Sequence, residues 1–361
     1  MGIDFSLDRW EKIRADAHLW WTRELERPLL HTTVSGADPG RDEPKLTSIS
    51  TQAIYDLTVP ADDIVDCWDW GLSQLEFLGD SFPSVWPNFG PGVLAAYMGG
   101  LPEPRDWTVW FYPPDKRQLA DLQFKYDPDN VWARRIKDIC RAAMDRWQGL
   151  VLVGMTDLGG TLDVLSTFRP ADELLLDLYD HPEQVRRTTW EIHEAWWQAF
   201  EDINGALQPA NPGHTSWAQI YSQQSSYMLQ SDFCYMIGPE MFDEFVKPEL
   251  TACCQRLGNA FYHLDGVGQL PHLESMLQID ALKGIQWVPG AGKCSDDNWA
   301  KVYRQIHAGG KLLQIYDSDE LQLLDTIVDQ IGTANCIVQI ARMGQDNRHL
   351  GVKQLKKYGA I

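Results

Sequence analysis

Short runs of apolar and β-branched residues alternate along the chain with longer segments whose apolar positions recur every three to four residues. The short runs have the composition of buried β-strands, and the longer segments have the spacing of amphipathic helices. Repeated alternation of this kind is typical of α/β proteins with a parallel sheet. The pattern predicts eight strands, at residues 28–34, 75–79, 150–155, 227–230, 260–264, 284–288, 311–316 and 336–340.

Eight strand–helix units are the number that closes a TIM barrel. The predicted fold is therefore α/β, a (β/α)8 barrel that forms a single domain over residues 1–361. Two long segments, 82–130 and 203–226, interrupt the alternation, and the first is rich in proline, glycine and tryptophan. We expect both to form long loops over the C-terminal face of the barrel, where the active sites of such barrels lie.

An aspartate follows five of the eight predicted strands: Asp80, Asp157, Asp232, Asp265 and Asp317. A single aspartate at such a place is most simply a turn former or a helix cap. Five at equivalent places predict a carboxylate-lined pocket. Clustered carboxylates push one another's pKa values apart, which suits acid and base roles.

His263 and Asp265 are two residues apart on the fifth predicted strand, so their side chains point to the same face, and Leu264 points to the other. Three interpretations follow from this placement. The pair can bind a metal such as zinc together with another carboxylate, for example Asp232, or it can act as an acid and base pair. It can also be a hydrogen-bonded pair with a purely structural role.

Aromatic, amide and basic side chains near the strand ends extend the predicted pocket. Most of the sixteen tryptophans are expected to pack helices onto the sheet. Besides Asp80, Asp157 and Asp317, the residues expected to contact substrate are Trp86, Gln286, Trp287, Tyr316, Gln339 and Arg342.

Charge and composition restrict the partners of this pocket. The formal net charge is −20, which argues against nucleic acid and favours a neutral or cationic small molecule. The seven cysteines are odd in number and form no Cys-x-x-Cys pair, which is typical of reduced thiols in a cytoplasmic protein. Neither a signal peptide nor a membrane span is predicted. An oligomer is compatible with the sequence.

At these strand ends the sequence resembles the uroporphyrinogen decarboxylase superfamily, which also contains methylcobamide methyltransferases. The resemblance covers nearly the whole chain, and it implies a (β/α)8 barrel. The segments that carry it are Arg27-Pro28, Asp232 with Ile237-Gly-Pro-Glu-Met-Phe, and Tyr262-His-Leu-Asp-Gly.

Two departures from the superfamily's patterns bear on activity. The decarboxylases hold substrate carboxylates with an arginine-rich segment after the first strand, whereas this chain has His31-Thr-Thr-Val-Ser-Gly there. The zinc methyltransferases use His-x-Cys on the fifth strand, whereas this chain has His263-Leu-Asp265. Replacing a thiolate with a carboxylate makes such a metal site harder.

The pocket chemistry predicts a carbohydrate-active hydrolase or lyase that acts on a neutral polyol or glycoside and requires no cofactor. Paired carboxylates cleave glycosidic bonds, and aromatic faces stack on sugar rings. Asp232 and Asp265 would be the catalytic pair, assisted by His263. The alternatives are a zinc-assisted methyltransferase of the corrinoid-dependent type with His263 and Asp265 as metal ligands, a decarboxylase, and a non-catalytic binding barrel.

Overall fold

The structure is a computed structural model that describes residues 2–294, 298–317 and 321–361. Its main sheet has seven strands in the order β2–β1–β11–β10–β9–β8–β7. All neighbouring strands in this sheet are parallel except β1 and β2, which are antiparallel. The strands are β1 (Leu29–Ser35), β2 (Leu75–Gly79), β7 (Ser226–Leu229), β8 (Asn259–Asp265), β9 (Leu282–Val288), β10 (Leu312–Asp317) and β11 (Ile337–Gly344).

Two small sheets lie outside the main one. Strand β3 (Ser84–Val85) pairs in parallel with β6 (Leu152–Val153), and β4 (Leu101–Pro104) pairs with β5 (Val109–Tyr112) in a hairpin. Each of the eight predicted strand segments contains a strand. The segment 82–130, predicted to be a loop, itself holds β3, β4 and β5.

The predicted closed eight-stranded barrel is not what the described residues form. Strand β2 runs antiparallel and occupies the edge of β1, where the second parallel strand of a barrel would pair. The parallel pair β3–β6 has two residues in each strand, and no ladder joins it to the main sheet within the described ranges. The fold is therefore an α/β fold whose seven-stranded, mostly parallel sheet does not close into a barrel within the described ranges.

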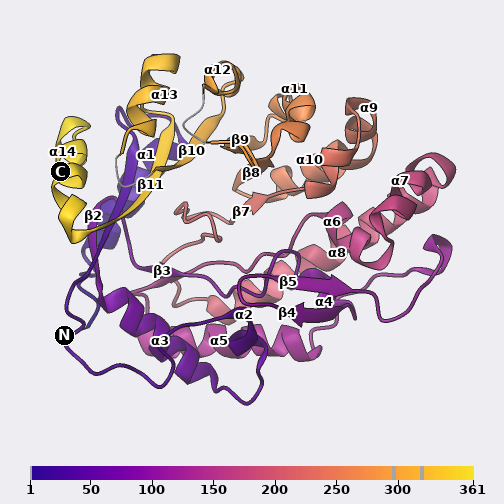
Figure 1. The fold of residues 1–361 in the computed structure, drawn as a ribbon, viewed down its shortest axis with the longest axis horizontal. Helices are drawn as coiled ribbons and strands as arrows, with labels where there is room; N and C mark the ends of the chain where they lie inside the picture. The colour runs from indigo at the N-terminus through magenta and orange to yellow at the C-terminus, as the bar shows by residue number, and fades with distance from the viewer. Residues whose placement is uncertain (1, 295–297, 318–320) are drawn as a thin grey trace.

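Helices surround these sheets (Figure 1). The C-terminal helices lie along one side of the main sheet, and α3, α5 and α8 lie on the opposite side of the molecule. None of the described helices has the length and apolar character needed to cross a membrane. The helices are α1 (Arg9–Trp21), α2 (Thr51–Tyr55), α3 (Ala61–Ser73), α4 (Leu94–Tyr97), α5 (Val131–Trp147), α6 (Thr161–Phe168), α7 (Ala171–Asp180), α8 (Pro182–Leu207), α9 (Pro239–Met241), α10 (Lys247–Arg256), α11 (Leu273–Leu277), α12 (Ala300–Ala308), α13 (Leu323–Ile331) and α14 (Arg348–Lys357).

Local sequence explains where the longest helix begins and why it stays in place. Pro182 stands at the first position of α8, where its missing N–H costs no hydrogen bond. The buried face of α8 then carries large aromatic side chains, including Trp196 and Phe200, whose rings stack with their centroids 5.2 Å apart. The Trp196 indole also donates to the carbonyl of Gly159, 3.1 Å away, so α8 supports the loop that follows β6.

Candidate active site

Four predicted site residues come together at the C-terminal ends of β6, β7 and β8. Asp157 follows β6, Asp232 follows β7, and His263 and Asp265 lie on β8. Burial raises the pKa of both Asp157 and Asp232; the charge of Asp232 adds to the rise at Asp157 and that of Asp265 to the rise at Asp232, while His263 opposes both. This group, together with Asp163, is called the mouth cluster below.

A chain of hydrogen bonds through two buried glutamines fixes the ring of His263. Gln314 donates from its amide nitrogen to the backbone carbonyl of Ala218. Its carbonyl oxygen then accepts from Gln286 Nε2, 3.0 Å away. The Gln286 oxygen in turn faces His263 Nδ1.

The direction of this glutamine relay follows from its first member. A backbone carbonyl only accepts, so the amide of Gln314 has one possible orientation, which sets the orientation of Gln286. The Gln286 oxygen also only accepts, so Nδ1 of His263 carries the proton. In the neutral imidazole, the free lone pair is therefore on Nε2, which lies 3.8 Å from Asp265 Oδ2. The Trp217 ring packs against the His263 ring in an edge-to-face arrangement, with centroids 5.0 Å apart.

The mouth cluster does not make a complete zinc site. His263 Nε2 and Asp265 Oδ2 are close enough to share an ion, but protein zinc sites have three or four protein ligands. Within the described residues, no third histidine, cysteine or carboxylate joins this pair to give three ligand atoms within 4.8 Å of one another. The donors present therefore do not fit the zinc that the superfamily resemblance implies.

Asp157 is buried and held by donors from two sides. Its carboxylate accepts from the backbone N–H of Gly159 at 2.9 Å and from the side-chain amide of Gln230 at 3.2 and 3.3 Å. Burial raises the pKa of Asp157 to about 6, and the charge of Asp232 adds to this effect. Asp157 is thus poised to change its protonation near neutral pH.

Asp163, in the first turn of α6, belongs to the same cluster but is not among the site residues predicted from the sequence. It accepts from the backbone N–H groups of Asp232 at 3.0 Å and Phe233 at 2.7 Å. Burial raises the pKa of Asp163 to about 7, with Asp232 contributing. The sequence signal for Asp163 was its place one helical turn after Gly159-Gly160. Its hydrogen-bond partners lie on another loop and could not be predicted from the sequence.

Adjoining cavities of about 400, 260 and 300 Å³ share Arg342, on β11, and Gln219. Each is lined by at least three aromatic side chains, and the predicted residues Trp86 and Tyr316 line the third of them together with Trp217. No hydrogen bond or ion pair joins the exposed guanidinium of Arg342 to another residue in the described part of the chain. In a protein with a large excess of acidic residues, this guanidinium lines a recess without a direct ion pair among the described residues, although Asp317 lines the same cavity.

Asp80 lies away from the mouth cluster. Because β2 is antiparallel to β1, its end lies beside the N-terminal end of β1. There the Asp80 carboxylate pairs through both oxygens with Arg27, at 2.6 and 2.8 Å, and accepts from the backbone N–H of Leu30. Burial opposes ionisation, but the Arg27 guanidinium outweighs it and holds the pKa of Asp80 below its ordinary value.

Three further predicted residues have structural partners. Trp287 pairs with Leu264 in the β8–β9 register, and so lies on the side of the sheet away from His263. It is buried against Trp299, with ring centroids 5.3 Å apart. Asp317 accepts from backbone N–H groups at the start of α13 and from Gln339, 2.6 Å away. Asp317 also lines a cavity beside Arg342.

Comparisons with known proteins agree with this architecture at the level of fold. No family model matches the sequence. No curated protein matches it either. Among solved structures, the chain is similar to a methyltransferase from Methanosarcina mazei, with a TM-score of 0.61 and 10% identity, over 96% of this chain and 98% of that one. At this identity the likeness concerns the fold alone, and it gives no support to the expected glycoside hydrolase.

Proposed function

We propose that this protein is a methyltransferase acting on a small molecule, with His263 as the base that activates the methyl acceptor. The observation that carries the proposal is the glutamine relay, which leaves the Nε2 lone pair of His263 free at the mouth. A positioned base of this kind contributes about 10²–10⁴ to a reaction rate. The likeness to a methyltransferase over the whole chain supports this choice of reaction.

The chemical step is a displacement at a methyl carbon. His263 Nε2 takes the proton from a hydroxyl or thiol of the acceptor as that oxygen or sulfur forms its bond to the methyl carbon. The bond between the methyl group and its donor breaks, and the electron pair stays with the donor. Asp265, 3.8 Å from Nε2, stabilises the imidazolium that forms. No protein-held metal is required for this step.

Arg342 indicates the kind of acceptor. An exposed guanidinium without a partner binds a carboxylate or another anion through two parallel hydrogen bonds. Arg342 shares a cavity of about 300 Å³ with Trp86, Trp217 and Tyr316, and the Trp217 ring contacts that of His263. This volume is in the range of small-molecule sites, and the aromatic side chains suit an apolar body. We therefore propose an acceptor that carries one anionic group, in place of the neutral or cationic molecule expected from the net charge.

The test is a screen for methyl transfer. The protein is incubated with methylated corrinoid, methylamine and methyl thioether donors and with small aromatic or aliphatic hydroxy acids and thiol acids, and the products are weighed by mass spectrometry. We expect transfer to an acid that falls about 100-fold or more in His263→Ala. Arg342→Lys should raise KM for the acid more than it lowers kcat.

The outer-face variant Trp287→Phe is the matched control, because this side chain lies on the opposite side of the sheet from His263. Full activity in His263→Ala would contradict the proposed base. Cleavage of aryl glycosides, lost in Asp232→Asn and Asp265→Asn, would instead support the hydrolase predicted from the sequence.

A further inference from the structure

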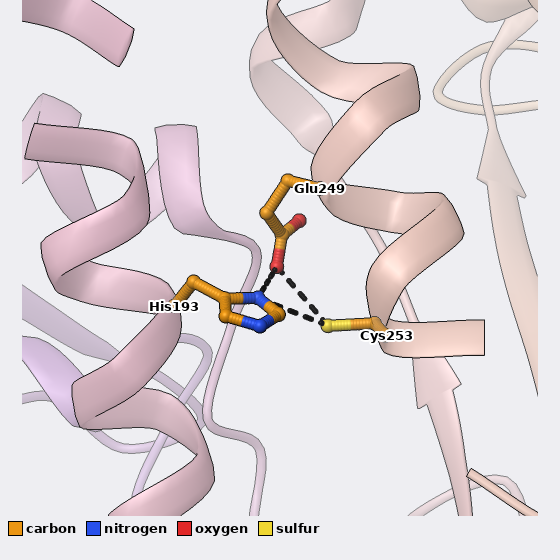
Figure 2. A group of neighbouring side chains, drawn as sticks. All are labelled: His193, Glu249 and Cys253. Carbon is orange, nitrogen blue, oxygen red and sulfur yellow. Dashed lines mark hydrogen bonds and ion pairs between the residues drawn. The ribbon is translucent and has the colours of Figure 1, made fainter. Parts of the chain in front are cut away.

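A second group of chemically reactive side chains lies between two helices, outside the mouth cluster. His193 projects from α8, and Glu249 and Cys253 project from α10 toward it (Figure 2). Glu249 and Cys253 are four residues apart, so they share one face of α10. All three are buried. Among the described residues, this is the one set of three or more such side chains whose ligand atoms lie within 4.8 Å of one another.

The three donor atoms converge on one point. His193 Nδ1 lies 2.7 Å from Glu249 Oε1, Cys253 Sγ lies 3.0 Å from the same oxygen, and Sγ and Nδ1 are 3.6 Å apart. Tetrahedral zinc with ordinary bond lengths sets its ligand atoms about 3.4–3.6 Å apart. The sulfur–nitrogen spacing already has this value, and the carboxylate oxygen must move away from the other two atoms by about 0.6–0.7 Å.

Charge also favours a cation here. Glu249 is a buried carboxylate, and no lysine or arginine in the described ranges pairs with it. Its other oxygen accepts from the hydroxyl of Thr161, 3.4 Å away. Among the described residues His193 is therefore the one possible cationic partner of this buried carboxylate, and a buried charge is costly unless it is compensated. A divalent ion bound by this carboxylate and the Cys253 thiolate would balance both negative charges.

The geometry excludes a catalytic cysteine–histidine–glutamate triad. In such a triad the two ring nitrogens of histidine face different partners. Here Nδ1 of His193 faces both Glu249 and Cys253. Burial and the adjacent Glu249 also raise the pKa of the Cys253 thiol well above its ordinary value, which is opposite to what a nucleophile needs.

A small cavity beside Glu249 and Cys253 leaves room for a further ligand. It is lined also by Gly160 and Thr161, and its volume is about 20 Å³. That is about enough for one water molecule. Three protein donors and one water complete a tetrahedral set.

We propose that His193, Glu249 and Cys253 bind one zinc ion that joins α8 to α10. The thiolate and imidazole favour zinc over magnesium or calcium, which prefer oxygen ligands. When the ion binds, the Cys253 thiol loses its proton to solvent. Zinc binding therefore releases at least one proton for each ion bound. The site does not depend on the proposed methyl transfer.

The experiment uses the full-length protein, stripped with a chelator and dialysed. Zinc is titrated calorimetrically in two buffers of different ionisation enthalpy, and bound metal is counted by mass spectrometry. We expect one zinc ion and at least one released proton per chain. Cobalt(II) in place of zinc should give the near-ultraviolet absorption of a thiolate–cobalt bond.

Matched variants locate the ion. Cys253→Ser should abolish the cobalt–thiolate band and weaken zinc binding about 100-fold or more, and His193→Ala should weaken zinc binding similarly. Cys254→Ser is the control, because Cys254 is the neighbouring buried cysteine of the same helix and lies outside the group. His263→Ala, at the mouth, should also leave zinc binding unchanged.

Two results would overturn the proposal. One is that wild-type protein binds no zinc at micromolar concentration, a result that needs no variant to fold. The other is that binding survives Cys253→Ser but is lost in His263→Ala or Cys254→Ser. Circular dichroism of each variant separates loss of the ligand from loss of the fold.

Discussion

His263 shows how much of a residue's chemistry depends on partners distant in the sequence. Its position beside Asp265 follows from the two-residue repeat of a strand, but its tautomer depends on Gln286, Gln314 and the carbonyl of Ala218. These partners lie on β9, β10 and a loop. The proposed base is therefore oriented by buried glutamines on two neighbouring strands.

This dependence makes a prediction about Gln314→Leu. Without its amide, Gln286 is free to turn, and the population of His263 with the proton on Nδ1 should fall measurably. The ¹⁵N chemical shifts of the His263 ring report the tautomer directly. Gln339→Leu is the matched control, because Gln339 is an equally buried glutamine whose amide bonds to Asp317 instead. Unchanged ring shifts in Gln314→Leu would show that the relay does not set the tautomer.

The raised pKa of Asp157 predicts how stability depends on pH. Its folded pKa is about 6 against an ordinary value of 3.8, so the folded state holds the extra proton between these values. Stability from this group is therefore lost as pH rises from about 4 to about 6. Urea unfolding should show the wild type losing roughly 2–3 kcal/mol relative to Asp157→Asn over this range. Parallel pH curves for the two proteins would contradict the shifted pKa.

At the scale of elements, the turn between β6 and α6 holds the mouth cluster together. A Cβ at Gly160 would lie 2.2 Å from the carbonyl oxygen of Gln230 and 2.6 Å from Asp163 Oδ2. Gln230 is also the residue whose amide holds Asp157. The loops after β6 and β7 therefore approach each other more closely than any side chain at position 160 allows.

Gly160→Ala should consequently destabilise the protein by more than about 2 kcal/mol, because the contact is with backbone that cannot turn aside. Gly205→Ala is the control: it lies inside α8, its Cβ would meet nothing within 4 Å, and it should stabilise by roughly 0.5–1 kcal/mol. Urea denaturation compares the two. A neutral Gly160→Ala would mean that the loops can separate without cost.

The elements themselves were largely predictable, but their directions were not. Apolar runs located a strand in all eight predicted segments, because the residues of a buried strand are themselves apolar. The direction of β2 could not be predicted in this way, because the sequence of Leu75–Gly79 suits a parallel and an antiparallel neighbour equally. The two-residue strand β3 is too short to leave a pattern. This is why Asp80 was expected beside Asp157 and lies at the other end of β1 instead.

The same limit applies to the helix layer. Periodicity places His193 and Cys253 on buried faces, which gives no reason to connect them. Only the packing of α8 on α10 brings them together with Glu249, 2.7 and 3.0 Å from one carboxylate oxygen. Residues on one strand, such as His263 and Asp265, can be paired from sequence, whereas residues on separate elements cannot.

At the scale of the molecule, chemistry and structural support occupy opposite ends of the sheet. The mouth cluster and Arg342 lie at the C-terminal ends of the parallel strands. At the other end, Asp80 joins β2, α1 and the start of β1 through Arg27, Lys12 and the N–H of Leu30. The β1–β2 ladder ends here with His31 paired to Gly79, and the ion-pair network joins α1 and Arg27 to that end of the ladder.

Asp80→Asn tests this division directly. The change leaves Arg27 without its buried partner and should lower the free energy of unfolding by about 3–5 kcal/mol. Because the folded pKa of Asp80 is lowered, its contribution is present above pH 4 and disappears as the pH falls through the folded value, so the two proteins should converge in acid. Asp16→Asn is the control: Asp16 also pairs with Arg27, at 2.9 Å, but is more exposed, so the loss should stay below about 1 kcal/mol. Ligand affinity at the mouth should be unchanged in Asp80→Asn. A variant that keeps its stability but loses ligand binding would instead return Asp80 to the substrate pocket.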